Sequence, residues 1–483
     1  MRSPRRRLLH AIGTLGAVAM SGCSSLGTTT RDREDSPDPV ESSNETTTPS
    51  LTPTATLTQT PVPTPIRESY GPTPPFDRTT KIAAADGEKR EYFGYSAAMS
   101  GDGSTVVVGA IYDRFPKQET PDGEASDDPA AVSLGPRGSA VVYSRTGRSW
   151  TRVAKLVPDV NHWQSFGQAV AIADDGLTAV VLDDDPGSAN VFSKGDGQWR
   201  QTASLTPADG DSNYQSAYAV STSADGSKVI VGDAGEDNAN GQRAGAAYVH
   251  GLIDDSWEHR SKLTPVDGDP NDQFGNEVEL SNDGSTAIVG AEFDEDPNGY
   301  AAGSAYIFAE NDGAWRQTAK LTAADGNDHD GFGLEVALSG DGSTAIVGAL
   351  DDETDDGDRA GSVYVFSRAG GAWPQDAKIT PFDRDDDGAF GFSIAVSDDG
   401  AVAIITDASD DDPYGGNSGS AYLYRRSEGS WSVDWKLVAP DGDDGDSFGR
   451  ATAMAGDASG AVITAAGDED PNGKRSGSAY LYE

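Results

Sequence analysis

The chain has 483 residues, of which 79 are acidic and 36 are basic, so its formal net charge is -43. Nucleic acid and anionic membrane surfaces are excluded as direct partners, because both would be repelled. Such a charge destabilises a compact chain in dilute buffer, whereas about 1 M salt shortens the Debye length to about 3 Å and screens the repulsion. The composition therefore favours a hypersaline environment and a protein of the halophilic archaeal type.

Residues 1–22 have the character of an export signal. The arginines Arg5 to Arg7 precede an uncharged stretch from Ala11 to Gly22, a basic region followed by an apolar one. The paired arginines resemble the twin-arginine type of signal. The apolar run is shorter than the roughly 20 residues that cross a bilayer. The segment Met20 to Cys23 resembles a lipobox, so Cys23 is the predicted site of lipid attachment. A plain cleaved signal with an incidental cysteine is the alternative.

Residues 23–75 are rich in Thr, Ser and Pro, with few apolar residues. Such a segment buries too little surface to offset the entropy of ordering, so it is predicted to be a disordered stalk between the lipid anchor and the rest of the chain. Asn44 begins an Asn-Glu-Thr sequon and is a candidate glycosylation site; an unmodified tether is equally compatible with the sequence. Cys23 is the single cysteine, which excludes an internal disulfide.

Residues 76–483 contain seven similar units. Each has an aspartate in a tight turn. In every unit but the third, a Phe-Gly pair begins nine residues before this aspartate; in the third unit Ser216-Ala217 takes its place. The turn aspartates are Asp102, Asp175, Asp225, Asp283, Asp341, Asp399 and Asp457, and the last five are spaced 58 residues apart. A repeat of this length points to a solenoid, a propeller or an array.

A second landmark distinguishes a ring from a linear stack. Five tryptophans stand five residues before a lysine, Trp199/Ser204 is a degraded copy, and Phe76/Lys81 comes before the first unit; the five pairs are Trp150/Lys155, Trp257/Lys262, Trp315/Lys320, Trp373/Lys378 and Trp431/Lys436. The last unit ends at Glu483 without such a segment. We therefore expect residues 76–84 to supply the outer strand of the blade that residues 448–483 begin.

Each unit reads as four short strands. In the fourth unit these are an alternating run from Phe274 to Leu280, a buried run from Thr286 to Ala291, a third from Gly303 to Phe308 and a fourth from Trp315 to Thr322. An Asp-Gly turn joins the first two as a hairpin. Four strands in each unit predict an all-β fold, a seven-bladed β-propeller of four-stranded blades closed by the N-terminal strand.

The Phe-Gly pair, the buried strand ending in Val-Gly-Ala and the Gly-Ser-Ala-Tyr segment resemble the FG-GAP repeat, which builds the propeller of integrin α subunits and of many bacterial and archaeal surface proteins. The resemblance covers residues 76–483. It implies extracellular binding or adhesion far more often than catalysis. The third unit departs from it by lacking Phe-Gly, and the second by having only residues 184–187 in place of a long loop.

Two acidic loops are weak candidates for calcium binding. Oxygen ligands at alternate positions before a turn glycine suit Ca²⁺, and the candidates are Asp294, Asp296, Asn298, Asp468, Asp470 and Asn472. Solvated acidic loops are the alternative. The integrin-type calcium loop lies between the first two strands, where this chain has a bare Asp-Gly turn, so the resemblance does not supply these ligands.

The longest insertion lies in the first unit, from Ile111 to Arg137. It is less acidic than its counterparts, so its residues Tyr112, Phe115, Lys117 and Leu134 are candidates for a binding rim. A tolerated surface insertion is the alternative. We also expect Trp315 and Trp373 to pack at the blade edge, with Lys320 and Lys378 extending their ammonium groups into water.

The sequence thus predicts a lipid-anchored protein on the outer face of the cell membrane, a monomeric propeller that recognises a glycan or an envelope protein. A structural envelope protein without a ligand is the alternative. A secreted hydrolase or lyase is less favoured, because no nucleophile elbow, zinc pattern or phosphate loop occurs. No cofactor other than calcium is indicated.

Overall fold

A computed structural model describes residues 76–84, 91–114, 137–158, 165–183, 188–206, 219–295, 298–353, 359–383, 388–411 and 413–483. The chain divides into two units, Met1–Pro61 and Val62–Glu483, and every described residue belongs to the second. The predicted signal, Cys23, Asn44 and the stalk lie outside the described residues.

The described residues form 28 strands in seven four-stranded antiparallel sheets, and no helix. No helix that could cross a membrane occurs among them. The strands are β1 (Thr79–Ile82); β2 (Phe93–Met99), β3 (Thr105–Arg114), β4 (Arg137–Thr146), β5 (Ser149–Leu156); β6 (Val170–Ile172), β7 (Thr178–Asp183), β8 (Ser188–Gly195), β9 (Gln198–Leu205); β10 (Ala219–Thr222), β11 (Lys228–Asp233), β12 (Ala246–Ile253), β13 (Ser256–Leu263); β14 (Val278–Leu280), β15 (Thr286–Ala291), β16 (Ser304–Asn311), β17 (Ala314–Leu321); β18 (Phe332–Leu338), β19 (Thr344–Ala349), β20 (Ser362–Ser367), β21 (Gln375–Ile379); β22 (Phe390–Val396), β23 (Val402–Asp407), β24 (Ser420–Ser427), β25 (Ser430–Leu437); β26 (Phe448–Met454), β27 (Ala461–Ala465) and β28 (Ser478–Tyr482).

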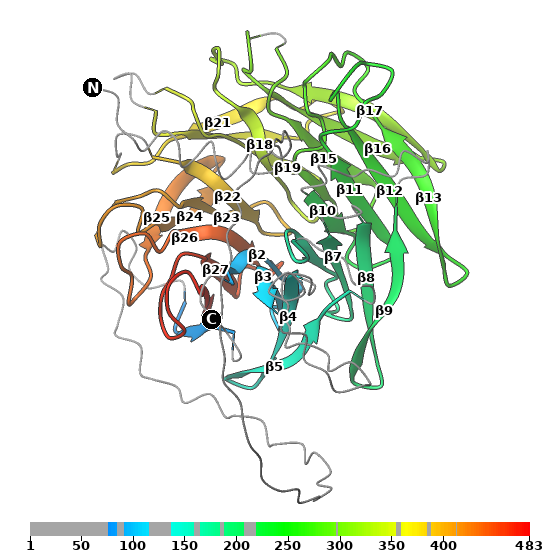
Figure 1. Ribbon diagram of the computed structural model, residues 1–483. Coiled ribbons are helices and arrows are strands. Elements are labelled where there is room, and N and C mark those ends of the chain that lie inside the picture. The colour runs from blue at the N-terminus through cyan, green and yellow to red at the C-terminus, as the bar shows by residue number, and fades with distance from the viewer. Residues whose placement is uncertain are drawn as a thin grey trace, which may run out of the picture. The chain divides into compact units, whose positions relative to one another are not determined.

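One strand of each sheet lies innermost, and the seven inner strands contact one another in a closed order: β2, β6, β10, β14, β18, β22, β26 and again β2. Figure 1 shows these strands gathered around the centre, with the other strands of each blade radiating outward. The chain is therefore a seven-bladed β-propeller, as the repeat spacing predicts.

The predicted closure of the ring is confirmed. Strand β1 pairs antiparallel with β28, from Thr79 opposite Tyr482 to Ile82 opposite Ala479. The N–H of Asp77 also donates to the carbonyl of Glu483 at 2.6 Å. The carboxylate of Glu483 in turn accepts a hydrogen bond of 3.0 Å from Trp150 Nε1 in the first blade. The two ends of the propeller chain thus meet in one blade.

Buried second strands and the Phe-Gly pair form the core between blades. All six residues of β15 are buried, and the Phe274 ring is fully buried against Tyr306 with 5.5 Å between ring centroids. The glycine is required by two constraints: Gly275 has φ +96°, and a Cβ there would lie 2.3 Å from the carbonyl oxygen of Ala246 in the preceding blade. The Phe-Gly pair therefore marks a place where two blades approach closely, and the glycine position of the pair cannot hold a larger residue.

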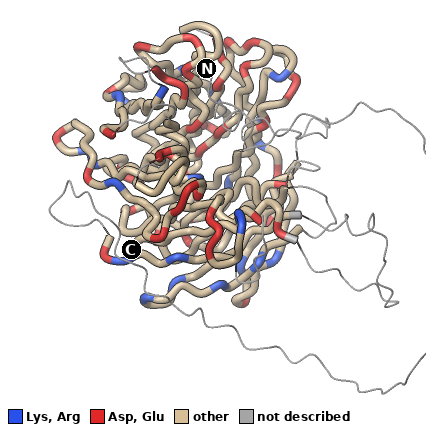
Figure 2. The backbone as a smooth tube through the Cα atoms, turned by 60° about the vertical axis from the view of Figure 1, so that its left-hand side comes forward, with Lys and Arg blue, Asp and Glu red and all other residues tan. Residues whose placement is uncertain are grey.

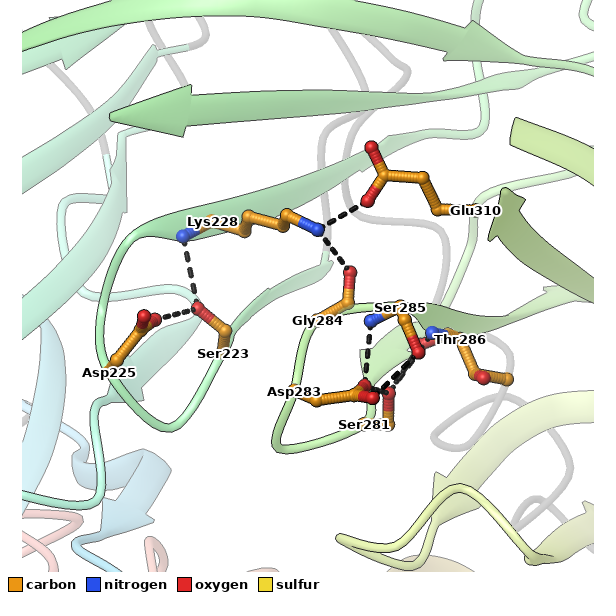
Figure 3. A network of polar contacts seen from close by, with 9 residues as sticks. All are labelled: Ser223, Asp225, Lys228, Ser281, Asp283, Gly284, Ser285, Thr286 and Glu310. Atoms are coloured by element: carbon orange, nitrogen blue, oxygen red, sulfur yellow. Dashed lines mark hydrogen bonds and ion pairs between the residues drawn. The ribbon is translucent and has the colours of Figure 1, made fainter. Parts of the chain in front are cut away.

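The Asp-Gly turns are held by a repeated side-chain network. In Figure 3 the hydroxyl of Ser281 donates to Asp283 at 2.7 Å, and Asp283 accepts the N–H of Ser285 at 2.8 Å. An added link occurs at Lys228, whose ammonium donates to the carbonyl of Gly284 at 2.9 Å and pairs with Glu310, both in the next blade. This lysine ties the third blade to the fourth.

The antiparallel order gives the propeller two unlike faces. Connections between second and third strands, and between consecutive blades, emerge on one face, which we call the loop face. The Asp-Gly turns and the hairpins between third and fourth strands emerge on the other, the turn face. The acidic loops and the long insertion of the first unit both belong to the loop face.

Candidate functional site on the loop face

A lysine–carboxylate–tyrosine cluster recurs on the loop face. In the fourth blade, Lys320 Nζ lies 2.9 Å from Asp294 Oδ2 and 3.0 Å from Asp267 Oδ2. The hydroxyl of Tyr306 donates to Asp294 at 2.5 Å, and the ammonium lies 5.3 Å from the centroid of the Tyr306 ring. Because Asp267 precedes the inner strand and Asp294 follows the second strand, one lysine joins two loops.

The lysine–carboxylate pair follows the repeat, although Val141 takes the place of the tyrosine opposite Lys155 in the first blade. The corresponding ion pairs of the other blades are Lys378 with Asp325 and Asp352, Lys436 with Asp383 and Asp410, Lys81 with Asp441 and Asp468, Lys262 with Glu236, and Lys155 with Asp113. The second blade lacks it: Ser204 pairs with Asn190, and Gln201 donates to Asn190 at 2.7 Å. The sequence also has Pro186 where the other units have the loop carboxylate. Lysine, tyrosine and carboxylate are therefore lost together.

These contacts correct one expectation. The ammonium groups of Lys320 and Lys378 are not in water: the two side chains are 17% and 27% exposed, and each contacts two carboxylates. The prediction treated each lysine as part of an isolated strand and did not consider the buried acids beside it. The packing prediction for the aromatic residues is confirmed, because Trp373 is buried and Trp315 packs against the core between blades.

The same contacts bear on the calcium candidates. Asp294 and Asp468 are both 3% exposed, and each has a lysine ammonium within 3 Å, at the place that a cation would take. Asn298 and Asn472 donate to the carbonyls of Ala323 and Ala84 at 2.8 Å. Among the described residues no group of three or more His, Cys, Asp or Glu side chains could hold a metal ion. The lysine-paired carboxylates do not fit a calcium shell, while Asp296 lies outside the described residues; calcium binding by these loops stays a prediction.

Three further aspartates of this face have perturbed acidity. Burial raises the pKa of Asp446 to about 7, with a further contribution from the charge of Asp468, although the N–H of Asp443 lowers it. Burial likewise raises the pKa values of Asp272 and Asp330, to about 6 each. Each of the three lies two residues before a Phe-Gly pair. Burial therefore moves the titration of these three carboxyls toward neutral pH.

Of the four residues of the predicted binding rim, one, Tyr112, is among the residues that the structure describes. Tyr112 is 40% exposed, and its ring meets the edge of Tyr92 with 5.5 Å between centroids. Arg475, from the loop of the neighbouring last blade, donates to the Tyr92 hydroxyl at 2.8 Å. Phe115, Lys117 and Leu134 lie outside the described residues. Sequence reasoning missed Tyr92 and Arg475; their positions, directly before Phe93 and two residues before Gly477, place both at this edge once the ring is closed.

A second exposed aromatic pair occurs on the same face. Tyr300 is 59% exposed and meets His329 with 5.1 Å between ring centroids. Phe293 is 36% exposed and stands at the repeat position of Tyr112, two residues after the buried second strand. Figure 2 shows acidic positions distributed over many loops of the described chain, with fewer basic ones between them. Apolar rings exposed among these acids are the residues that a partner could desolvate at least cost.

Sequence reasoning also missed residues around the axis. Glu279 lies in β14 of the fourth blade, directly after the start of that strand, with Glu277 just before it, and Glu335 lies in β18 of the fifth; burial raises the pKa values of Glu279 and Glu335 to about 8. Glu335 Oε1 accepts the N–H of Ile394 in the sixth blade at 3.1 Å. The sequence signal that could have identified them is their spacing, because every second residue of a strand lies on the same face and one face of an inner strand is directed at the axis.

Two of the described histidines lie away from the loop face. His250 and His259 lie on adjacent strands of the third blade with 5.7 Å between ring centroids, and His250 is 3% exposed. Burial lowers the pKa of His250 to about 4. This pair packs within a blade and presents no base to the loop face.

Comparison with known proteins identifies the class of this propeller. The FG-GAP repeat family matches residues 76–126, 199–250, 257–308, 315–366, 373–424 and 431–482, more than half of the chain. The chain belongs to the FG-GAP repeat family. Each matched segment from residue 199 onward begins at the outer strand of one blade and ends in the third strand of the next. Five of the six begin at the tryptophan landmark and the first at Phe76.

A search of curated proteins gave no match. Among solved structures, the hydrazine synthase of Kuenenia stuttgartiensis is similar at 15% sequence identity and a TM-score of 0.47, covering 79% of this chain and 95% of that one. At this level of similarity the comparison carries no argument about function.

Proposed function

We propose that this chain is a cell-surface recognition module, held on the outer face of the membrane by a lipid on Cys23 and a stalk over residues 23–75. The observation that supports it is the contrast between the two faces. The turn face repeats one short Ser-x-Asp-Gly design with side chains satisfied internally. The loop face differs from blade to blade and exposes Tyr112, Tyr300 and Phe293. Variable loops on a rigid scaffold are where recognition concentrates.

The partner is an extracellular glycan or an envelope protein, contacted around Tyr92, Tyr112 and Arg475. Tyr and Arg are the residue types that dominate binding hot spots, because each combines a large contact area with hydrogen-bonding groups. Arg475 is exposed, and its hydrogen bond to Tyr92 orders the pair before a partner arrives. Ordering in the free protein reduces the entropy lost on association.

A structural envelope protein without its own ligand is the second candidate. The observation in its favour is that a lysine of the outer strand pairs with a loop-face carboxylate in six of the seven blades and joins two loops in four of them, which stabilises the fold irrespective of any partner. Such a protein would show no dependence on the exposed aromatic residues of one rim.

The experiment that tests the proposal is capture of purified surface glycans and envelope proteins by the immobilised chain in high salt. In a matched variant, Tyr112 is replaced by Ser and residues 114–136 are replaced by the short loop of residues 295–302, so that Asp113 keeps its ion pair with Lys155. Capture by the native chain and its loss in the variant, with an unchanged melting temperature, support recognition. Equal capture by both moves the site elsewhere, and no capture by either favours the structural candidate.

A further inference from the structure

The fourth blade carries an exposed aromatic side chain beside a carboxylate on the loop face. Tyr300 is 59% exposed, and its N–H donates to Asp328 Oδ1 at 3.1 Å. The N–H of His329 in turn donates to the carbonyl of Tyr300 at 2.8 Å, and the two rings are in contact. Asp328 is exposed and has no ion pair among the described residues. We call Tyr300, Asp328 and His329 the acidic patch.

The edge between the last and first blades carries the opposite charge. Arg475 donates to the Tyr92 hydroxyl, and its guanidinium carbon lies 5.8 Å from the centroid of the Tyr92 ring. Lys474 precedes it in the same loop, and the Tyr112 ring contacts that of Tyr92. Both cations are exposed, and within the described ranges neither has an ion pair. We call these four residues the basic edge.

The repeat shows that these charges are particular to their blades. In the fifth blade Arg359, at the repeat position of Arg475, is paired with two carboxylates of its own loop at 3.4 and 3.8 Å. Tyr300 and Lys474 also share one repeat position, three residues before the glycine that precedes the third strand. The third and fifth blades have Gln242 and Asp358 there. One position therefore gives a ring to the fourth blade and a cation to the seventh.

The acidic patch and the basic edge lie opposite one another on the same face. In the closed ring of seven inner strands, the junction between the last and first blades faces the fourth blade across the axis, with blades one to three on one side and blades five to seven on the other. Figure 1 shows β16 and β27 on opposite sides of the centre. A two-fold axis parallel to the loop face therefore places the acidic patch of each copy against the basic edge of the other, in two identical contacts.

This arrangement satisfies both surfaces at once. The basic edge of one copy offers cations to Asp328 of the other and tyrosine rings to Tyr300. A saccharide without cationic groups could complement the basic edge alone. Two copies with a net charge of -43 each repel one another in dilute buffer, but at about 1 M salt the Debye length is about 3 Å. Contacts between rings are not screened by salt, so the repulsion falls while the attraction between the rings stays.

We propose that the partner of the loop face is a second copy of this chain, bound face to face with its basic edge on the acidic patch. This inference rests on the proposed function, since it names the envelope protein that the same face recognises. In dilute buffer, where the net charge keeps two copies apart, the chain should be the monomer that the sequence predicts.

The test begins with sedimentation equilibrium of the full chain at about 0.1 M and about 1 M salt, where the Debye lengths are about 10 Å and about 3 Å. We expect the mass of a monomer at the lower concentration and a doubled mass at the higher one. Lys474→Asp and Tyr300→Lys each place a residue that another blade has at the same repeat position. Each variant alone should associate with itself about tenfold more weakly, because like charges then face one another.

Mixing the two variants is the decisive measurement. In the mixed pair, the aspartate at position 474 of one copy faces the lysine at position 300 of the other, and the second contact is native. The mixture should therefore form a dimer as strongly as the native chain does, although neither variant does so alone. The matched control is Glu428→Lys, because Glu428 is exposed in the β24–β25 hairpin on the turn face, and it should associate like the native chain.

Three results would overturn the inference: a native chain that stays monomeric at about 1 M salt, equal self-association of the native chain and the folded variants, or a mixture that associates no better than either variant. If Tyr300→Lys does not fold, Tyr300→Gln takes its place, and unchanged self-association of that variant counts against the acidic patch. Capture of a surface glycan by a chain that stays monomeric would identify a saccharide as the partner and leave the proposed function standing.

Discussion

The carboxyl of Glu279 in the fourth blade accepts the main-chain N–H of Leu338 in the fifth blade at 2.6 Å. The same relation recurs around the axis, where Glu335 accepts from Ile394 and Ser393 Oγ accepts from Thr452 at 3.2 Å. Side chains of one inner strand thus satisfy the backbone of the next. Where that side chain is a glutamate, the contact makes the closed ring sensitive to pH.

The first prediction follows from the direction of these pKa values. Burial raises the pKa of Glu279 from 4.5 to about 8 in the folded chain, so between these values the folded state binds more protons than the unfolded state. The free energy of unfolding should therefore fall as pH rises from about 4.5 to about 8. Glu279→Gln should flatten this decline, whereas Glu428→Gln, at an exposed position, should not. Denaturant titration at constant high salt measures both, and an identical slope in the two variants would refute the assignment.

The second prediction concerns ring closure. Deletion of residues 76–84 removes β1 and leaves β28 as an unpaired edge, so the melting temperature in high salt should fall sharply. Deletion of residues 24–61, which belong to the first unit of the chain, is the matched control and should leave the melting temperature unchanged. A truncated protein that melts like the native one would show that the strand pairing does not stabilise the ring.

The third prediction concerns the lysine clusters. Lys320→Met leaves the buried carboxylate of Asp294 without its cation and should destabilise the chain by about 3 kcal/mol. Lys474→Met changes an exposed lysine and should cost at most about 0.5 kcal/mol. The double variant Lys320→Met/Asp294→Asn should recover part of the loss. Calorimetric melting of the three proteins decides, and equal effects of the two single variants would contradict the cluster's role.

The fourth prediction compares two glycines that both have positive φ. Gly275→Ala places a Cβ 2.3 Å from a backbone carbonyl oxygen, so it should destabilise the chain by more than about 2 kcal/mol. Gly313 has φ +75° in a hairpin on the turn face, with nothing within 4 Å of an added Cβ. Gly313→Ala should therefore cost only about 1 kcal/mol of backbone strain. Similar unfolding free energies for the two variants would show that the close approach between blades is not a constraint.

The repeat spacing was sufficient to predict the strands, the number of blades and the closure by residues 76–84, because each depends on local patterns or on where a copy is missing. The lysine clusters were not predicted, since Lys320 and Asp267 are 53 residues apart and meet only when a loop from the preceding blade folds over the strand. The residues around the axis were missed for a related reason. Glu279 lies on an alternating strand that reads as half-exposed, and only the closed ring brings it to the backbone of Leu338 in the next blade.

At the predicted rim, the sequence drew attention to Tyr112 through the length of the insertion. It could not reveal Tyr92 or Arg475, because the latter lies in the last unit and reaches the first only through closure of the ring. Short motifs thus predicted the scaffold well and the surface of the scaffold incompletely, since that surface is assembled from residues distant in sequence.

The central claim is that the loop face, around Tyr112 and Arg475, holds the partner site. The most direct measurement compares capture of purified surface glycans and envelope proteins by the native chain, by Tyr112→Ser/Arg475→Ser, and by Leu252→Ser, which alters a residue of similar exposure, 41%, on the turn face. We predict that capture is lost in the double variant and retained in Leu252→Ser, with all three proteins melting alike in high salt. Capture retained by the double variant, or lost in Leu252→Ser, would contradict the account.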